Sequence, residues 1–183
     1  MSFMNTKIMR ALHIRIAMLA LILMSVNGGW AQSASSTVIL PAQFLAALTD
    51  TSLTGHYQDP ETAYINHYIK WESLIEGKVI RQSKEAPEVD FKMETWLFVD
   101  QPGYQKTFIQ ISNRGTVSKG EFAMRDGKLW LEGKTYEGDK MIRRFRQSFE
   151  ISDSGELVDC FYRFTNDKWT KGHEIHYSSN SKD

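Results

Sequence analysis

The sequence lacks most of the features that identify an enzyme or a disulfide-stabilised domain. Its only cysteine is Cys160, so an intramolecular disulfide is excluded and the core alone must stabilise the fold. Apolar neighbours favour a buried, inert thiol there. No glycine-rich phosphate loop, nucleophile elbow or His-Glu-x-x-His motif is present. His173 and His176 lie three residues apart, which on a strand places them on opposite faces, so neither a metal site nor a cofactor is expected.

An excess of basic residues is also lacking. Lysine plus arginine and aspartate plus glutamate number 22 each, and residues 1–31 carry three of the basic and none of the acidic ones. Without that segment, 19 basic residues face 22 acidic ones, a net charge of −3. We expect no nucleic-acid partner, because binding a phosphate backbone needs a net basic face. The local cluster of Arg143, Arg144 and Arg146 lies in a strand that alternates sides, which favours a solvated outer face.

Residues 1–31 have the pattern of a signal peptide. A basic stretch precedes the apolar run of residues 16–26, and Gly29 and Ala31 supply the small residues that a signal peptidase needs. An uncleaved anchor is the alternative, but an apolar run of about eleven residues is short for a bilayer. Cys160 lies too far along the chain to carry a lipid there. We therefore predict an exported, soluble protein without a stable membrane anchor, located in the periplasm or outside the cell.

The next segment, residues 32–67, differs from the rest in composition. It begins with a small polar leader, and residues 40–48 then place apolar side chains at helical spacing behind a proline. A second start signal, with Asp59 as N-cap and Pro60 at the first helical position, predicts another short helix reaching about His67. We expect these one or two short helices at one end of a β-barrel domain formed by residues 68–178. Residues 179–183 complete the chain as a loose tail.

Runs of β-forming residues, each about eight to twelve long, follow one another between residues 91 and 178. Each run stops at a turn of the Gly/Asn/Asp type. The turns are Gln101-Pro102-Gly103, Asn113-Arg114-Gly115, Arg125-Asp126-Gly127, Glu137-Gly138-Asp139, Asp153-Ser154-Gly155 and Thr165-Asn166-Asp167. This spacing predicts an all-β fold in which eight or more antiparallel strands form a meander. The meander must close into a barrel or pair with a second sheet to protect its edges.

Alternation along the strands predicts which side chains share a face. In the first strand, one face is mostly apolar and is expected in the core; it carries residues 91, 93, 95, 97 and 99. Trp96 and Phe98 share the other face with charged residues. Aromatic side chains mixed with polar ones line ligand cavities in some barrels and cover the outer wall in others. Both interpretations remain open for this face.

The last two strands carry the densest polar chemistry. Asp159 and Arg163 share one side of the first, and His173 and Tyr177 share one side of the second with Trp169, Lys171 and Ile175. If a tight hairpin joins them, Arg163 and His173 would form a basic pair that attracts an anionic head group. The alternative is structural: Arg163 pairs with Asp159, and His173 merely hydrogen-bonds a carbonyl.

Several short segments resemble one kind of domain. They are Glu76–Ser83, Met93–Trp96, Ser118–Gly120, Leu131–Gly133, Phe161–Arg163 and Gly172–Ile175. Residues 71–177 as a whole resemble bacterial secreted domains of the lipocalin-like (calycin) type, with which no activity is associated. The resemblance implies a closed antiparallel barrel with an internal cavity, and it adds no established site.

Three functional hypotheses follow. The first is a binding protein without catalysis, which holds a small amphipathic or apolar ligand against Trp96, Arg163, His173 and Tyr177. The second is an enzyme of the cone-shaped α+β type, in which Asp159, His173 or Glu94 performs acid–base chemistry. The third is a structural or protein-binding domain without a cavity. The sequence indicates no catalytic residue for the first hypothesis and gives no oligomeric state.

Overall fold

A computed structural model describes residues 41–75, 78–99 and 106–179. The expected signal peptide and polar leader lie outside the described residues, as do the turn at Gln101-Pro102-Gly103 and residues 180–183 of the expected tail. In the segments that are described, no helix is both long enough and apolar enough to cross a membrane.

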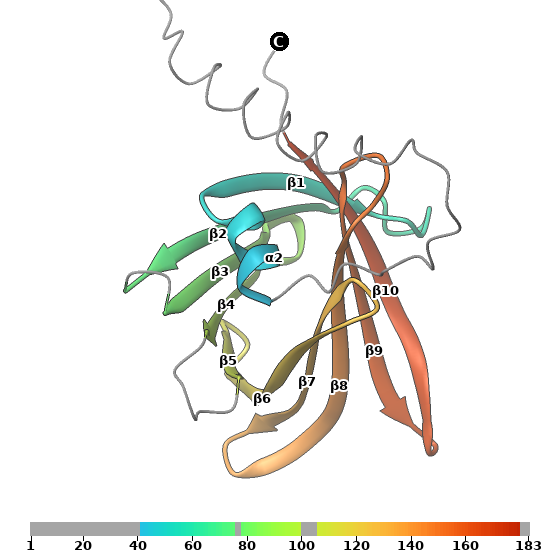
Figure 1. Cartoon of the computed structure of the whole chain (residues 1–183). Coiled ribbons are helices and arrows are strands. Elements are labelled where there is room, and N and C mark those ends of the chain that lie inside the picture. Colours follow the sequence, from blue (N-terminus) through green and yellow to red (C-terminus); the bar gives the residue numbers. More distant parts are fainter. Residues whose placement is uncertain (1–40, 76–77, 100–105, 180–183) are drawn as a thin grey trace, which may run out of the picture. The chain divides into compact units, whose positions relative to one another are not determined.

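The described residues form a closed barrel of ten antiparallel strands (Figure 1). Its strands are β1 (Thr51–Tyr57), β2 (Asn66–Leu74), β3 (Val79–Ala86), β4 (Phe91–Phe98), β5 (Thr107–Ser112), β6 (Thr116–Arg125), β7 (Lys128–Glu137), β8 (Lys140–Ile151), β9 (Leu157–Thr165) and β10 (Lys168–Ser179). Each strand pairs with its neighbours in sequence, and β1 pairs with β10 to close the barrel. The prediction of an all-β meander that closes into a barrel is confirmed. Closure leaves no unpaired edge.

Turn chemistry explains the order of the strands. The hairpin between β6 and β7 turns through Asp126 and Gly127, whose φ angles are 51° and 75°. The hairpin between β9 and β10 turns through Asn166 and Asp167, at 51° and 57°. Positive φ at both central residues is the geometry that follows the right-handed twist of the flanking strands, and these residue types tolerate it best. Both turns lie where the sequence predicted them.

The N-terminal part confirms one predicted helix and corrects the other. Helix α2 (Pro41–Leu48) forms as expected and packs against the barrel core. The second helix prediction is wrong, because residues 60–64 form turns and β2 already begins at Asn66. Asp59 does cap the backbone N–H of Glu61 at 3.0 Å, but only a turn follows. The residues from Asn66 onward form β2, which pairs with β1 and β3. The barrel therefore includes residues that precede residue 68.

The interior has an apolar part at the helix end of the barrel. Alternation places Thr95, Leu97 and Val99 inside, as predicted, and leaves Trp96 and Phe98 outside. The inner apolar side chains join those of α2 in one cluster: Phe44, Leu45, Leu48, Ile69, Trp71, Ile80, Leu97, Val99, Phe108, Phe122, Leu129, Leu131, Phe145, Phe149, Leu157, Ile175 and Tyr177. Because α2 contributes three buried side chains to this cluster, it closes that end of the barrel.

Two glycines make room for aromatic packing in the middle of the barrel. One row of paired residues crosses β5, β6, β7 and β8, and it consists of Phe108, Gly120, Gly133 and Phe145. The two phenyl rings meet edge to face, with their centroids 6.0 Å apart. A Cβ atom on Gly120 would lie 2.0 Å from the carbonyl oxygen of Glu132, which only a backbone shift could relieve. Glycine is therefore required by close approach at this position.

We expect Gly120→Ala to lower the free energy of unfolding by about 2–3 kcal/mol, the usual cost of overpacking a core. Denaturant unfolding of the purified barrel measures it. Glu121→Ala is the matched control, because Glu121 is exposed on the next position of the same strand and its loss should change stability by less than about 0.5 kcal/mol. Equal stability of the two variants would contradict this interpretation of the glycine row.

Candidate functional site

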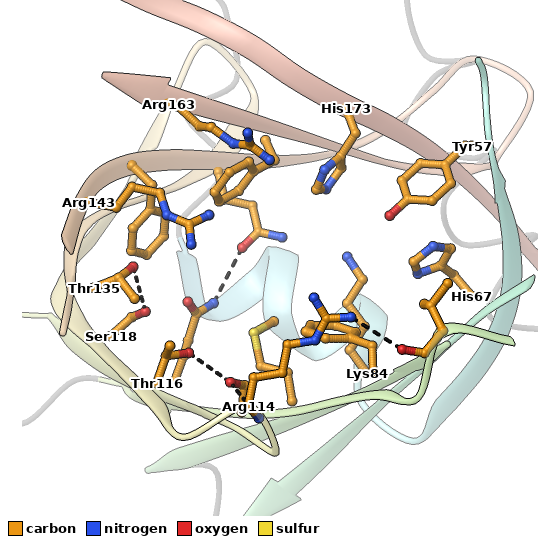
Figure 2. Close-up of a pocket in the computed structure, with 18 residues that line it drawn as sticks. Tyr57, His67, Lys84, Arg114, Thr116, Ser118, Thr135, Arg143, Arg163 and His173 are labelled. Atoms are coloured by element: carbon orange, nitrogen blue, oxygen red, sulfur yellow. Dashed lines mark hydrogen bonds between the residues drawn. The ribbon is translucent and has the colours of Figure 1, made fainter. Parts of the chain in front are cut away.

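A cavity of about 300 Å³ lies inside the barrel at the end away from α2 (Figure 2). Its lining comes from all ten strands and from the η1 turn (Pro87–Val89) between β3 and β4. The course of β1 shows which end of the barrel this is. The strand begins just after α2, and its last residue, Tyr57, lines the cavity together with His67 at the start of β2. The cavity is thus the part of the barrel interior that the apolar core leaves unfilled.

Three arginines line the cavity, and none of its lining residues is acidic. Arg143 and Arg163 extend from neighbouring strands β8 and β9, and Arg114 extends from the turn between β5 and β6 (Figure 2). Arg114 Nη2 donates to the carbonyl oxygen of Val89 at 3.2 Å. Among the residues that the structure describes, neither Arg143 nor Arg163 forms an ion pair or a side-chain hydrogen bond. The cavity therefore carries positive charge that the described protein groups do not neutralise.

Local packing holds the two adjacent guanidinium groups in place. Arg143 and Arg163 lie over the ring of Phe161, at 5.8 and 6.0 Å from its centroid. Burial lowers the pKa of Arg143, and the charge of Arg163 lowers it further. Two like charges close together in a partly buried site repel each other, and an anion between them would relieve this repulsion.

A buried polar layer separates the cavity from the apolar core. Lys84 Nζ lies 2.5 Å from Asp159 Oδ2, and the two side chains are 4% and 0% exposed. Gln147 donates to the other carboxylate oxygen of Asp159 at 2.8 Å, and Gln110 donates to Gln147 at 3.3 Å. These contacts use both carboxylate oxygens, so the alternative pairing of Asp159 with Arg163 does not form. Lys84 and Asp159 neutralise each other and leave the arginine charges uncompensated.

Two histidines face the cavity in their neutral form. His67 is 2% exposed, and both of its ring nitrogens lack a hydrogen-bond partner among the described residues. Burial and the nearby Lys84 charge lower the pKa of His67 to about 3 and that of His173 to about 4. The ring of Tyr57 contacts both histidines edge-on, at centroid distances of 4.5 and 5.4 Å. Each neutral ring carries one N–H donor and one bare nitrogen acceptor, but both nitrogens of His67 are themselves buried and do not open onto the cavity.

The structure separates the four residues proposed from the sequence. Arg163 and His173 both line the cavity, but His173 is neutral there and does not form the expected basic pair with Arg163. The expectation for Trp96 needs correction, because its side chain is on the outer face of β4 and the residue is 38% exposed. Tyr177 lies in the apolar core beneath the polar layer, with the Lys84 ammonium 5.7 Å from its ring centroid. It does not line the cavity, and burial raises its pKa well above the usual value.

A β-bulge corrects the predicted faces of β10. The pairing of β10 with β9 shifts register between Lys171 and His173. His173, Ile175 and Tyr177 therefore point inward, whereas Trp169, expected on the same side, packs outside against Phe164 with a ring distance of 5.1 Å. A bulge inserts one residue into the alternation and re-aims the side chains that follow it.

Sequence reasoning missed most of the remaining lining residues. Arg143 was assigned to a solvated cluster and Arg114 to a turn, whereas both reach into the cavity. One signal was available, because strict alternation from the apolar Phe145 places Arg143 and Gln147 on the same face of the strand. The sequence around His67 and Lys84 carries no local signal for the cavity, and the partner of Lys84, Asp159, lies 75 residues further along the chain.

The described residues offer little for metal or acid–base chemistry. Among them, no group of three or more His, Cys, Asp or Glu side chains could hold a metal ion. Burial and the neighbouring Glu174 raise the pKa of Cys160 to about 11, so its thiol stays protonated. Glu94, the third residue considered for acid–base catalysis, lies outside the barrel near Arg81, at 3.9 Å. What the cavity offers chemically is cationic and neutral hydrogen-bond donors.

No family model matches the chain, and no curated protein matches it either.

Proposed function

We propose that this protein is an exported, lipocalin-like barrel that binds a small ligand through an anionic group in its inner cavity, without catalysis. The main support is the convergence of three arginines in a cavity with no acidic lining residue. A guanidinium group matches a carboxylate or a phosphate with two parallel hydrogen bonds. The N-terminal sequence pattern supports export, and N-terminal sequencing of the mature protein would test it.

The half-buried charge of Arg143 favours a ligand over a purely structural domain. Its guanidinium group belongs to the cavity lining beside a second cation, Arg163, and burial lowers its pKa. A domain without a binding function would gain stability by replacing Arg143 with an uncharged residue, because burying a charge beside a like charge is costly. Residues that lower stability but face a cavity are typical of binding sites.

We expect Arg163→Met to weaken anion binding about tenfold or more, because it keeps much of the side-chain volume and removes the charged donors. Calorimetric titration with citrate and fluorescence titration with a fatty-acid analogue provide one probe of each anion type. Thermal melts alongside should differ by only a few degrees, since Arg163 forms no ion pair among the described residues.

Two results would contradict the proposed function. One is that the wild-type protein binds neither probe, and the other is that Arg163→Met leaves the affinity for a bound probe unchanged. Native mass spectrometry of the protein purified from its own cells gives an independent test, which the proposal expects to show a co-purifying anionic small molecule.

A further inference from the structure

We infer that the ligand is a compact anion with at least two negative charges, held between Arg114 on one wall and Arg143 with Arg163 on the other. This inference rests on the proposed function and narrows it to one chemical class. Polycarboxylates and sugar phosphates share that chemistry. This class differs from the small amphipathic or apolar ligand that the sequence alone suggested.

Charge complementarity favours more than one negative group. The three guanidinium groups carry three positive charges, and the only other Lys or Arg side chain in the lining, Lys84, is paired with Asp159. Arg143 is half-buried, whereas Arg114 and Arg163 are exposed, so solvent screens their charges but leaves their donors free to bind an anionic group. A ligand with two or three charges can pair with more of these groups than a single carboxylate can.

The cationic groups are held before any ligand arrives. Arg163 is paired with Phe145 across β8 and β9, which makes Arg143 its diagonal neighbour on the inner face. Arg114 is fixed by its hydrogen bond to Val89 and by the ring of Phe91, 5.6 Å from its guanidinium carbon. Figure 2 shows Arg114 reaching into the cavity from the side opposite Arg143 and Arg163. Pre-positioned groups lose little entropy on binding, which favours a small ligand with its charges at a fixed separation.

The floor of the cavity limits ligand length. Beneath the arginines lies the hydrogen-bonded layer of Lys84, Asp159, Gln147 and Gln110, and below it the core is filled up to α2. A hydrocarbon chain could enter the barrel only by breaking the buried ion pair in this layer. A volume of about 300 Å³ is also at the lower end of ligand pockets. The lining therefore suits a short polar molecule.

The test is calorimetric titration of the wild-type protein with citrate, ribose 5-phosphate and decanoate at pH 7 and low salt. We expect at least one of the two polyanions to bind about 100-fold more tightly than decanoate, because each added charged contact contributes about tenfold or more. Binding of citrate would indicate a polycarboxylate ligand, and binding of ribose 5-phosphate would indicate a phosphate ester. Raising the salt concentration should weaken polyanion binding strongly.

Matched arginine variants locate the site. Arg143→Gln should weaken polyanion binding about 10- to 100-fold, since it removes one cation from the cavity. Arg144→Gln removes the same charge from the next residue of β8, but Arg144 stacks outside on Phe164 at 4.5 Å, so its loss should change the affinity less than twofold. Arg143→Lys keeps the positive charge but removes the paired donors of the guanidinium group, so its loss of affinity should be intermediate. This variant provides a second measurement in case Arg143→Gln fails to fold.

The possible failures are distinct. Decanoate binding as tightly as the polyanions would overturn the compact polyanion while leaving the proposed function standing. Equal losses in Arg143→Gln and Arg144→Gln would show a diffuse charge effect and overturn the assigned cavity. A wild-type protein that binds no anion of either type would overturn both the inference and the proposed function.

Discussion

Replacing Lys84 by methionine is expected to lower the free energy of unfolding by about 3–5 kcal/mol, which is the usual cost of removing one partner from a buried ion pair. Lys84 is 3% exposed and is the cationic partner of Asp159, which is fully buried. Methionine fills most of the same space but leaves the carboxylate with Gln147 as its only side-chain hydrogen-bond partner among the described residues. Guanidinium unfolding at pH 7 measures the loss.

An exposed ion pair provides the matched control. Lys128 Nζ lies 2.7 Å from Glu150 on the outer face, where both side chains are about one third exposed. Lys128→Met should therefore cost less than about 1 kcal/mol. The double variant Lys84→Met with Asp159→Leu should recover much of the stability lost in the single one, because no uncompensated charge remains. Equal losses for the two lysines would contradict the role assigned to the buried layer.

Local sequence signals were sufficient to predict the architecture. Paired turn residues such as Asp126 and Gly127 fix where each hairpin reverses, and the alternation around Leu97 fixes which face is buried. Both signals act over a few residues, so they can be interpreted without knowing the fold. A meander also joins strands that follow each other in sequence, which makes the pairing order predictable.

The site was less predictable because closure of the barrel assembles it. Lys84 and Asp159 are separated by 75 residues, and no local pattern links them. The helix signal at Asp59 produced only a turn, because the pairing of β2 with its neighbours competes for the same residues. On β10, the bulge after Lys171 reverses the alternation, so strict period-two reasoning misplaced Trp169. Long-range pairing and register shifts are therefore what the sequence left undetermined.

Mild acid is expected to destabilise the ligand-free barrel by about 3 kcal/mol between pH 6.5 and pH 5. The pKa of an unfolded histidine is about 6.5, whereas in the barrel the pKa of His67 is about 3 and that of His173 about 4. The unfolded chain therefore binds about one more proton than the folded one at pH 6.5 and about two more at pH 5, so stability falls as the pH falls. Denaturant unfolding at several pH values, after removal of bound anions, measures the slope.

Phenylalanine variants separate the histidines from the carboxylates. The lowered pKa values of Glu72, Glu88 and Glu174 make stability depend on those groups only at more acidic pH, where the unfolded carboxylates gain protons. The double variant His67→Phe with His173→Phe should therefore lose most of the slope between pH 6.5 and 5. At pH 7, His67→Phe alone should be at least as stable as the wild type, since it removes two buried nitrogens without partners among the described residues. An unchanged slope in the double variant would show that other groups bind the protons. It would contradict the lowered pKa values of the two histidines.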